Sequence, residues 1–172
     1  MATMHPCEKV GVDFVDTAPY RFSNSVDLRI TPEQVFEVMA DASAWPRWAK
    51  VITKVTWTSP PPYGPGTTRT VDMRGGLVAT EEFLVWEPST TIAFRFNEAS
   101  EKTIRAFAER YDVLRTDTGC RLTWNLSLDV DGPARRTMPI ARPINNLAFK
   151  WFLRNLRRHT DKVYGSSANR SV

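Results

Sequence analysis

The chain has 172 residues, of which 42% are hydrophobic and 24% charged, so it fits one globular domain and not a disordered segment. Its two cysteines, Cys7 and Cys120, are too few for a disulfide framework, and no apolar run approaches the roughly 20 residues that span a bilayer. The formal net charge of +4 is mildly basic. Because the first ten residues also lack the apolar stretch of a signal peptide, we expect a cytoplasmic protein.

The two ends of the chain show no clear hydrophobic period. Residues 1–19 are predicted to form an N-terminal arm that is partly ordered at best. Residues 165–172 are small and polar, and they are predicted to form a flexible tail. The folded domain is therefore expected to cover residues 20–164.

The first predicted strand, at residues 20–30, runs directly into a helix. The second half of this strand alternates apolar and polar side chains, as a half-buried strand does. Thr31 and Gln34 have the spacing of a capping box, which predicts the helix start. A second short helical segment follows, and it carries Trp45 and Trp48.

Six further segments have the composition of strands and are separated by short turns rich in Gly, Pro, Asp and Ser. Connections this short join only antiparallel neighbours, because a parallel crossover needs a dozen or more residues. The segments together predict an antiparallel meander. They are residues 51–59, 67–74, 77–86, 91–97, 103–116 and 120–129.

The last predicted element is a long helix from about residue 143 to residue 164. On a helical period its large apolar side chains are expected on one broad side, with Lys150, Arg154 and Arg157 opposite. One helix cannot bury that apolar side alone, so we expect it to lie across the concave face of the sheet. Its members are Ile144, Leu147, Ala148, Trp151, Phe152, Leu156 and Val163.

Several motifs stand at marked places along this order of elements. They are ITPEQVF at the strand-to-helix junction (30–36), WPRW in the second helix (45–48), GPGT in a loop (64–67), WEP at a strand end (86–88) and GCRLTW at the last strand (119–124). With these motifs, the chain from about residue 20 to residue 162 resembles the START-like or SRPBCC helix-grip superfamily. That superfamily includes the birch pollen allergen and the polyketide cyclase/dehydrase and lipid-transport proteins.

The resemblance implies an α+β helix-grip fold, in which a seven-stranded curved antiparallel sheet wraps around a long C-terminal helix. The strands come in the order of one strand, two short helices and six strands. The resemblance also implies an internal cavity and a small ligand. It does not imply a particular reaction, because one fold hosts many functions.

The sequence contains few of the residue patterns that are typical of catalytic sites. The only histidines are His5 in the arm and His159 in the last helix, where a half-buried structural histidine is the favoured interpretation. Neither the cysteines nor the histidines have zinc-like spacing, and the glycines match no dinucleotide or phosphate loop. We therefore expect neither a metal nor a cofactor.

Apolar side chains that share strand or helix faces are the candidates for a ligand site. They could equally be close-packed core, but a sheet curved around a helix favours a cavity for the set as a whole. The clearest alternation is on the last strand. The candidates are Trp57, Val71, Met73, Phe83, Phe94, Phe96, Phe107, Trp124, Leu126, Leu147 and Trp151.

A few polar residues share the phase of these apolar faces. Arg69 is in phase with its apolar strand neighbours, Arg105 and Glu109 are in phase with Tyr111, and Glu81 is in phase with Phe83. If they point inward, an Arg–Glu pair and a tyrosine hydroxyl would anchor a ligand, and a buried Glu would serve as general acid or base. Alternatively, they face solvent, or a bulge exchanges the faces.

Three functions remain open at this point. The first is a carrier or sensor for a small apolar molecule such as a lipid, isoprenoid or polyketide. The second is a cyclase or dehydratase that uses Glu109, Tyr111 and Arg69 in the same cavity, and the third is a protein-interaction module.

A run of bases on and before the last helix suggests one further partner. A transient anionic membrane surface would fit this run, although a solvated helix face is the simpler interpretation. No nucleic acid is expected, and the oligomeric state is undetermined. The bases are Arg135, Arg136, Arg142, Lys150, Arg154 and Arg157.

Overall fold

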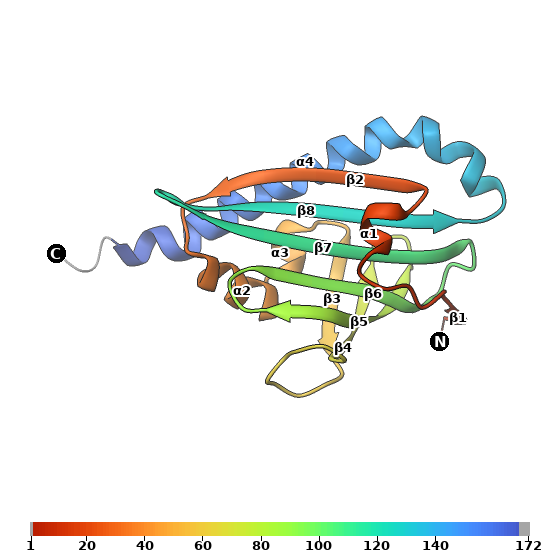
Figure 1. Cartoon of the computed structure of the whole chain (residues 1–172), viewed down its shortest axis with the longest axis horizontal. Coiled ribbons are helices and arrows are strands. Elements are labelled where there is room, and N and C mark those ends of the chain that lie inside the picture. Colours follow the sequence, from red (N-terminus) through yellow and green to blue (C-terminus); the bar gives the residue numbers. More distant parts are fainter. Residues whose placement is uncertain (1, 169–172) are drawn as a thin grey trace.

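The computed structural model describes residues 2–168, in which a curved antiparallel sheet and a long C-terminal helix dominate (Figure 1). Seven strands of this part of the chain form the sheet in the order β2-β8-β7-β6-β5-β4-β3. This architecture confirms the predicted α+β helix-grip fold. The strands are β2 (Tyr20–Leu28), β3 (Ile52–Trp57), β4 (Thr68–Met73), β5 (Val78–Glu87), β6 (Thr91–Ala99), β7 (Ile104–Thr116) and β8 (Gly119–Val130).

Two short helices, α2 (Pro32–Ala40) and α3 (Trp45–Trp48), link β2 to β3. The predicted capping box starts α2: the backbone N–H of Gln34 donates to Thr31 Oγ1 at 3.3 Å, and the backbone N–H of Thr31 donates to Gln34 Oε1 at 3.0 Å. The indole of Trp45 donates to the carbonyl of Met39 at 3.0 Å, which fixes α3 against the end of α2. Both tryptophans of α3 are therefore held in the core.

A β-bulge near the start of β7 changes which side chains face inward. The register of β7 against β8 shifts between Ile104 and Ala106. Arg105, which shares the strand period of Phe107 and Tyr111, is half-exposed and forms ion pairs with Glu8 at 3.3 Å and Asp129 at 3.5 Å. Of the alternatives that the sequence leaves open for Arg105, the structure has the bulge that exchanges the faces.

The helix α4 runs from Pro133 to Ala168, so it starts ten residues before the predicted position and includes Pro139 and Pro143. It lies along β2 and closes one side of the sheet (Figure 1). The tail predicted at residues 165–172 is helical as far as Ala168, and its last four residues lie outside the described part. No helix among the described residues is long and apolar enough to cross a membrane.

The predicted orientation of α4 is wrong for part of its length. The side chains that pack into the core are Phe152, Leu153 and Leu156. Leu147 and Trp151 point away from the sheet and are 67% and 46% exposed. The helix carries apolar side chains on two opposite sides, whereas the helical period predicts a single broad face.

The N-terminal segment is more regular than an arm. Its strand β1 (His5–Pro6) pairs with β6, and the backbone N–H groups of Cys7 and Glu8 donate to the carbonyls of Asn97 and Arg105. Because Asn97 and Arg105 belong to β6 and β7, the segment fills the gap where these two strands diverge. Met1, the first residue of the predicted arm, lies outside the described residues.

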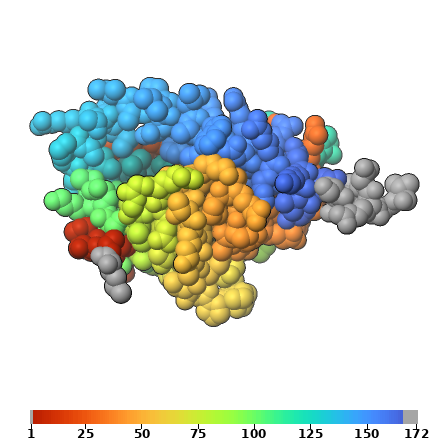
Figure 2. Space-filling view, turned by 180° about the vertical axis from the view of Figure 1, so that it is seen from behind, coloured from red at the N-terminus to blue at the C-terminus, as the bar shows by residue number. Residues whose placement is uncertain are grey.

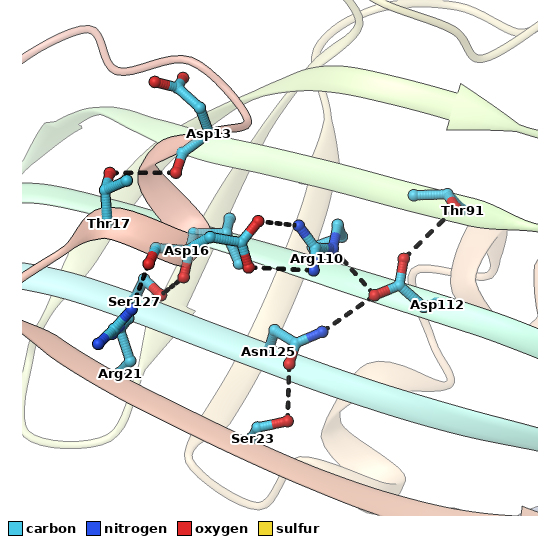
Figure 3. A network of polar contacts seen from close by, with 11 residues as sticks. Asp13, Asp16, Thr17, Arg21, Ser23, Thr91, Arg110, Asp112, Asn125 and Ser127 are labelled. Atoms are coloured by element: carbon cyan, nitrogen blue, oxygen red, sulfur yellow. Dashed lines mark hydrogen bonds and ion pairs between the residues drawn. The ribbon is translucent and has the colours of Figure 1, made fainter.

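The helix α1 (Phe14–Thr17) rests on the outer face of the sheet. Ser127 donates to the carbonyl of Val15 at 2.6 Å, and the alternation of β8 puts Ser127 on the face opposite to Trp124. A polar network extends this contact, in which Arg110 bonds Asp16 at 2.8 Å (Figure 3). The guanidinium of Arg110 lowers the pKa of the Asp16 carboxyl. The outer face of the sheet thus carries polar contacts that hold α1 in place. The inner face is therefore the candidate for a ligand site.

Candidate functional site

A cavity of about 270 Å³ lies between the inner face of the sheet and α4. Strands β2 to β8, the helix α3 with the connection to β3, and the middle of α4 supply its walls. The lining is largely aromatic and aliphatic, with a few charged side chains. Nine residues predicted for the site line it: Arg69, Met73, Phe94, Phe96, Phe107, Glu109, Tyr111, Trp124 and Leu126.

Cross-strand pairing places the aromatic side chains of the cavity. Tyr111 on β7 is the register partner of Trp124 on β8, and their rings are parallel with centroids 5.8 Å apart. Phe96 stacks on Phe107 at 4.0 Å. These pairs follow from the period of two in each strand, which brings alternate residues to the same face.

Five other residues predicted for the site do not line the cavity. Val71 and Phe83 are fully buried in the core, and the indole of Trp57 donates to the carbonyl of Ala40 at 2.9 Å. Leu147 and Trp151 lie on the outer side of α4. The prediction that Trp151 forms a wall of the cavity is therefore wrong, because the helix is rotated relative to the expected face.

The cavity has further lining residues that the sequence does not predict. The sequence did mark Trp45 and Trp48 as part of a short helix, but nothing in it showed that this helix faces the cavity. On α4 the lining comes from Phe149 and Phe152, which lie three residues apart and share one side of the helix. Further members are Phe22, Val51, Ile52, Leu77 and Asn145.

A buried ion pair supplies the most polar part of the wall. Arg69 and Glu81 face each other across β4 and β5, they are 1% and 3% exposed, and Arg69 Nε donates to Glu81 Oε2. Burial raises the pKa of Glu81, while the positive charge of Arg69 opposes that rise. Of the alternatives that the sequence leaves open for these polar residues, Arg69 and Glu81 adopt the inward-pointing Arg–Glu pair.

Two nitrogens of the Arg69 guanidinium make no hydrogen bond in the described part of the chain. Its carbon lies 4.2 Å from the ring centroid of Trp45 and 4.7 Å from that of Phe94, so aromatic faces surround it. Neither Nη1 nor Nη2 has a hydrogen-bond partner among residues 2–168. Trp48 Nε1 is also buried without a partner in that part of the chain. The wall therefore contains donors without acceptors, which the surrounding side chains cover.

A second polar pair lies beside the first. The Tyr111 hydroxyl donates to Glu109 Oε2 at 2.6 Å, and both side chains are buried. Burial raises the pKa of Glu109 to about 8, and the nearby Glu81 adds to the rise. Burial also raises the pKa of Tyr111 well above 10. Glu109 is therefore mainly protonated at neutral pH, and its proton is available inside the cavity.

The indole N–H of Trp124 lies at the edge of this second pair. It makes no hydrogen bond of normal geometry in the described part of the chain, yet it is close enough to Glu109 to lower the pKa of that carboxyl slightly. Within residues 2–168, no group of three or more His, Cys, Asp or Glu side chains is placed to hold a metal ion. The chemistry that the cavity offers is proton donation and hydrogen bonding.

Proteins of known sequence or structure resemble this chain. Uncharacterized proteins of Mycobacterium tuberculosis and Mycobacterium bovis are 60% identical over 164 residues, which is 95% of this chain and 98% of theirs. A START superfamily protein from Mycobacterium smegmatis has a similar structure, with a TM-score of 0.70 at 13% identity, covering 83% of this chain and 98% of that one.

A second similar structure is the di-domain ARO/CYC StfQ from the steffimycin biosynthetic pathway. Its TM-score is 0.68 at 11% identity, and the match covers 84% of this chain and 52% of that one. At such low identities, the two structures show a shared fold only. Residues 19–161 match the family described as polyketide cyclase / dehydrase and lipid transport, and the chain belongs to this family.

Proposed function

We propose that this protein binds one small, mainly apolar molecule that carries a hydrogen-bond acceptor, and that it acts as its carrier or sensor. The observation that supports this most strongly is the cavity of about 270 Å³ with the unpartnered guanidinium nitrogens of Arg69 in its wall. An apolar lining with a few well-placed polar groups is typical of small-molecule sites. A carbonyl, phenolate or carboxylate oxygen would complete the contacts of Arg69.

The energetics of the wall favour such a ligand. A buried donor without a partner costs about 1–3 kcal/mol, and a hydrogen bond to a charged group contributes about 1.5–3 kcal/mol. A ligand oxygen that accepts a hydrogen bond from Arg69 would remove the cost of the unpartnered donor and add the hydrogen bond to the charged guanidinium. The pair with Glu81 holds the guanidinium in place beforehand, so little side-chain entropy is lost on binding.

The size of the cavity favours a compact ligand. Small-molecule sites commonly enclose about 300–1,000 Å³, and this cavity lies at the lower end. A molecule of one or two rings, or a short isoprenoid, fits this size better than a long-chain lipid. The family name covers both lipid transport and polyketide cyclisation, so it is compatible with either kind of ligand.

Glu109 supports a second candidate function, a cyclase- or dehydratase-type enzyme. A general acid or base works best when its pKa is near the operating pH, and the pKa of Glu109 is raised to about 8. The ionised fraction of Glu109, which grows as the pH approaches 8, could remove a proton next to a ligand carbonyl, while Arg69 stabilises the resulting enolate oxygen. The third possibility, an interaction module, has less support because it does not need an internal cavity.

Native mass spectrometry with organic extraction of the purified protein tests the main proposal directly, because a bound small molecule would be detected and weighed. A titration with 8-anilinonaphthalene-1-sulfonate, which has aromatic rings and an acceptor group, gives a quantitative assay. We expect saturable binding that weakens in Arg69→Met/Glu81→Met, a double variant that removes both buried charges together. The control Leu114→Gln, at a side chain that is 68% exposed on β7, should bind as the parent does.

Titration results that are the same in the parent and the double variant would contradict the role of Arg69. The enzyme alternative has its own test, which is the uptake of deuterium by acetophenone in heavy water, followed by NMR. Faster uptake with the parent than with Glu109→Gln would support proton transfer. Equal rates would remove Glu109 from that mechanism.

A further inference from the structure

The outer side of α4 carries a continuous row of exposed apolar side chains. Ile140, Ile144, Leu147 and Trp151 are 78%, 71%, 67% and 46% exposed. Their spacings of four, three and four residues place them on one side of the helix, opposite to the side that packs on the sheet. We call these four residues the outer row. Isolated exposed apolar residues are ordinary, but a row of four along one helix marks an interaction surface.

Basic side chains border the outer row. Arg136 precedes Ile140 by four residues, Arg154 follows Trp151 by three, and Lys150 follows Leu147 by three, so each is a helical neighbour of the row. All three are exposed, and none of them makes a hydrogen bond or ion pair within residues 2–168. The helix has no acidic residue before position 161. The charged residues that border the row are therefore all positive.

The outer row ends beside the cavity. Trp151 lines a shallow depression together with Lys50, Arg74, Val51 and Phe152. Val51 and Phe152 also line the cavity. Figure 2 shows the surface of α4, in light to dark blue, along one long side of the molecule. A partner bound to this surface would be next to the cavity wall.

We propose that the outer row docks the protein on the surface of an anionic lipid bilayer. Aliphatic side chains with a tryptophan at one end suit the boundary between headgroups and acyl chains, where amphipathic helices insert their apolar face. Exposed arginine and lysine on the same helix attract anionic headgroups. An apolar row beside basic residues, with no acidic residue near it, therefore fits both the apolar and the anionic component of such a membrane.

Other partners fit this surface less well. A second copy of the chain packed on the same face would bring basic borders together, and like charges oppose such an interface. A nucleic acid would engage the bases but would leave the aliphatic side chains of the row without suitable contacts. Self-association through the row would be detected as a dimer of the free protein.

The test is sedimentation of the full chain with vesicles of phosphatidylcholine alone and of phosphatidylcholine with phosphatidylserine, at low and high salt. We expect binding only to the vesicles that contain phosphatidylserine, and weaker binding at high salt. The triple variant Arg136→Gln/Lys150→Gln/Arg154→Gln should bind roughly 100-fold more weakly. The matched control Lys9→Gln/Lys54→Gln/Lys102→Gln removes the same charge from exposed positions outside α4 and should bind as the parent does.

The apolar part of the surface needs its own variant. Ile144→Gln/Leu147→Gln should weaken binding about tenfold or more, because it removes two side chains that would leave water on docking. Both residues are exposed, so the variant should fold as the parent does. Leu114→Gln, which removes an equally exposed leucine from β7, is the control.

Three results would overturn the proposal. The first is that the parent does not bind vesicles, and the second is that its binding does not depend on phosphatidylserine. The third is that the variants and their controls lose vesicle binding equally. A dimer of the free protein that dissociates in Ile144→Gln/Leu147→Gln would assign the row to a second copy. Titration of 8-anilinonaphthalene-1-sulfonate in the absence of vesicles reports on the cavity separately, and it should be unchanged in these variants.

Discussion

Replacing Glu109 by Gln should change how the stability of the protein depends on pH. The pKa of this carboxyl is raised by burial from 4.5 to about 8 in the folded protein. As pH rises from about 4.5 to 8, the unfolded chain loses this proton while the folded chain keeps it, so folding becomes less favourable. At 1.36 kcal/mol per pH unit, the ionisation of this residue should lower the free energy of unfolding of the parent by about 3–4 kcal/mol between pH 5 and pH 8.

The Gln side chain cannot ionise, but its carbonyl can still accept the hydrogen bond from Tyr111. Urea unfolding at pH 5, 6, 7 and 8 should therefore show the free energy of unfolding of the parent falling relative to that of Glu109→Gln, until the difference has changed by about 3–4 kcal/mol. Glu98→Gln, the same change at an exposed site on β6, should follow the parent. Parallel curves for the parent and Glu109→Gln would show that the carboxyl is not held in an apolar site.

Three further substitutions test the fold and the cavity by urea unfolding. Thr31→Ala should reduce the free energy of unfolding by about 1 kcal/mol, because it removes the side-chain cap of α2, whereas Thr31→Ser should retain most of it. Arg69→Met alone should cost about 3–5 kcal/mol by leaving Glu81 buried without its partner, and Arg69→Met/Glu81→Met should recover much of that loss. Trp124→Ala should cost about 3–5 kcal/mol and also weaken binding of 8-anilinonaphthalene-1-sulfonate. A loss below about 1 kcal/mol for Trp124→Ala would contradict its place in the wall.

The strands could be predicted well because their signals are local. On β8, strict alternation identifies Trp124 and Leu126 as inward-facing residues, and both line the cavity. The capping box at Thr31 likewise depends on residues three positions apart. The order of the strands in the meander follows from short turns, so the amino-acid sequence alone is enough to predict the topology of this part of the sheet.

The parts that could not be predicted depend on tertiary contacts. The helical period of α4 shows where apolar residues lie, but it does not show which of two apolar sides meets the sheet, and the prediction places Leu147 and Trp151 on the wrong side. The sequence leaves the orientation of Arg105 open, because a bulge leaves no mark in a single sequence. The pairing of β1 with β6 joins residues more than 90 positions apart, which no local pattern can show.

The pairing of β2 with β8 has a consequence for how the protein is made. Tyr20 of β2 pairs with Leu128 of β8. The strand β2 is therefore synthesised about 100 residues before the strand with which it pairs. At roughly 5–20 residues per second, this interval lasts on the order of 5–20 seconds. Polar side chains such as Ser23 and Ser25 keep one face of the waiting strand soluble during that time. Closure of the sheet, and with it the formation of the cavity, must therefore be among the last events after translation of the strands.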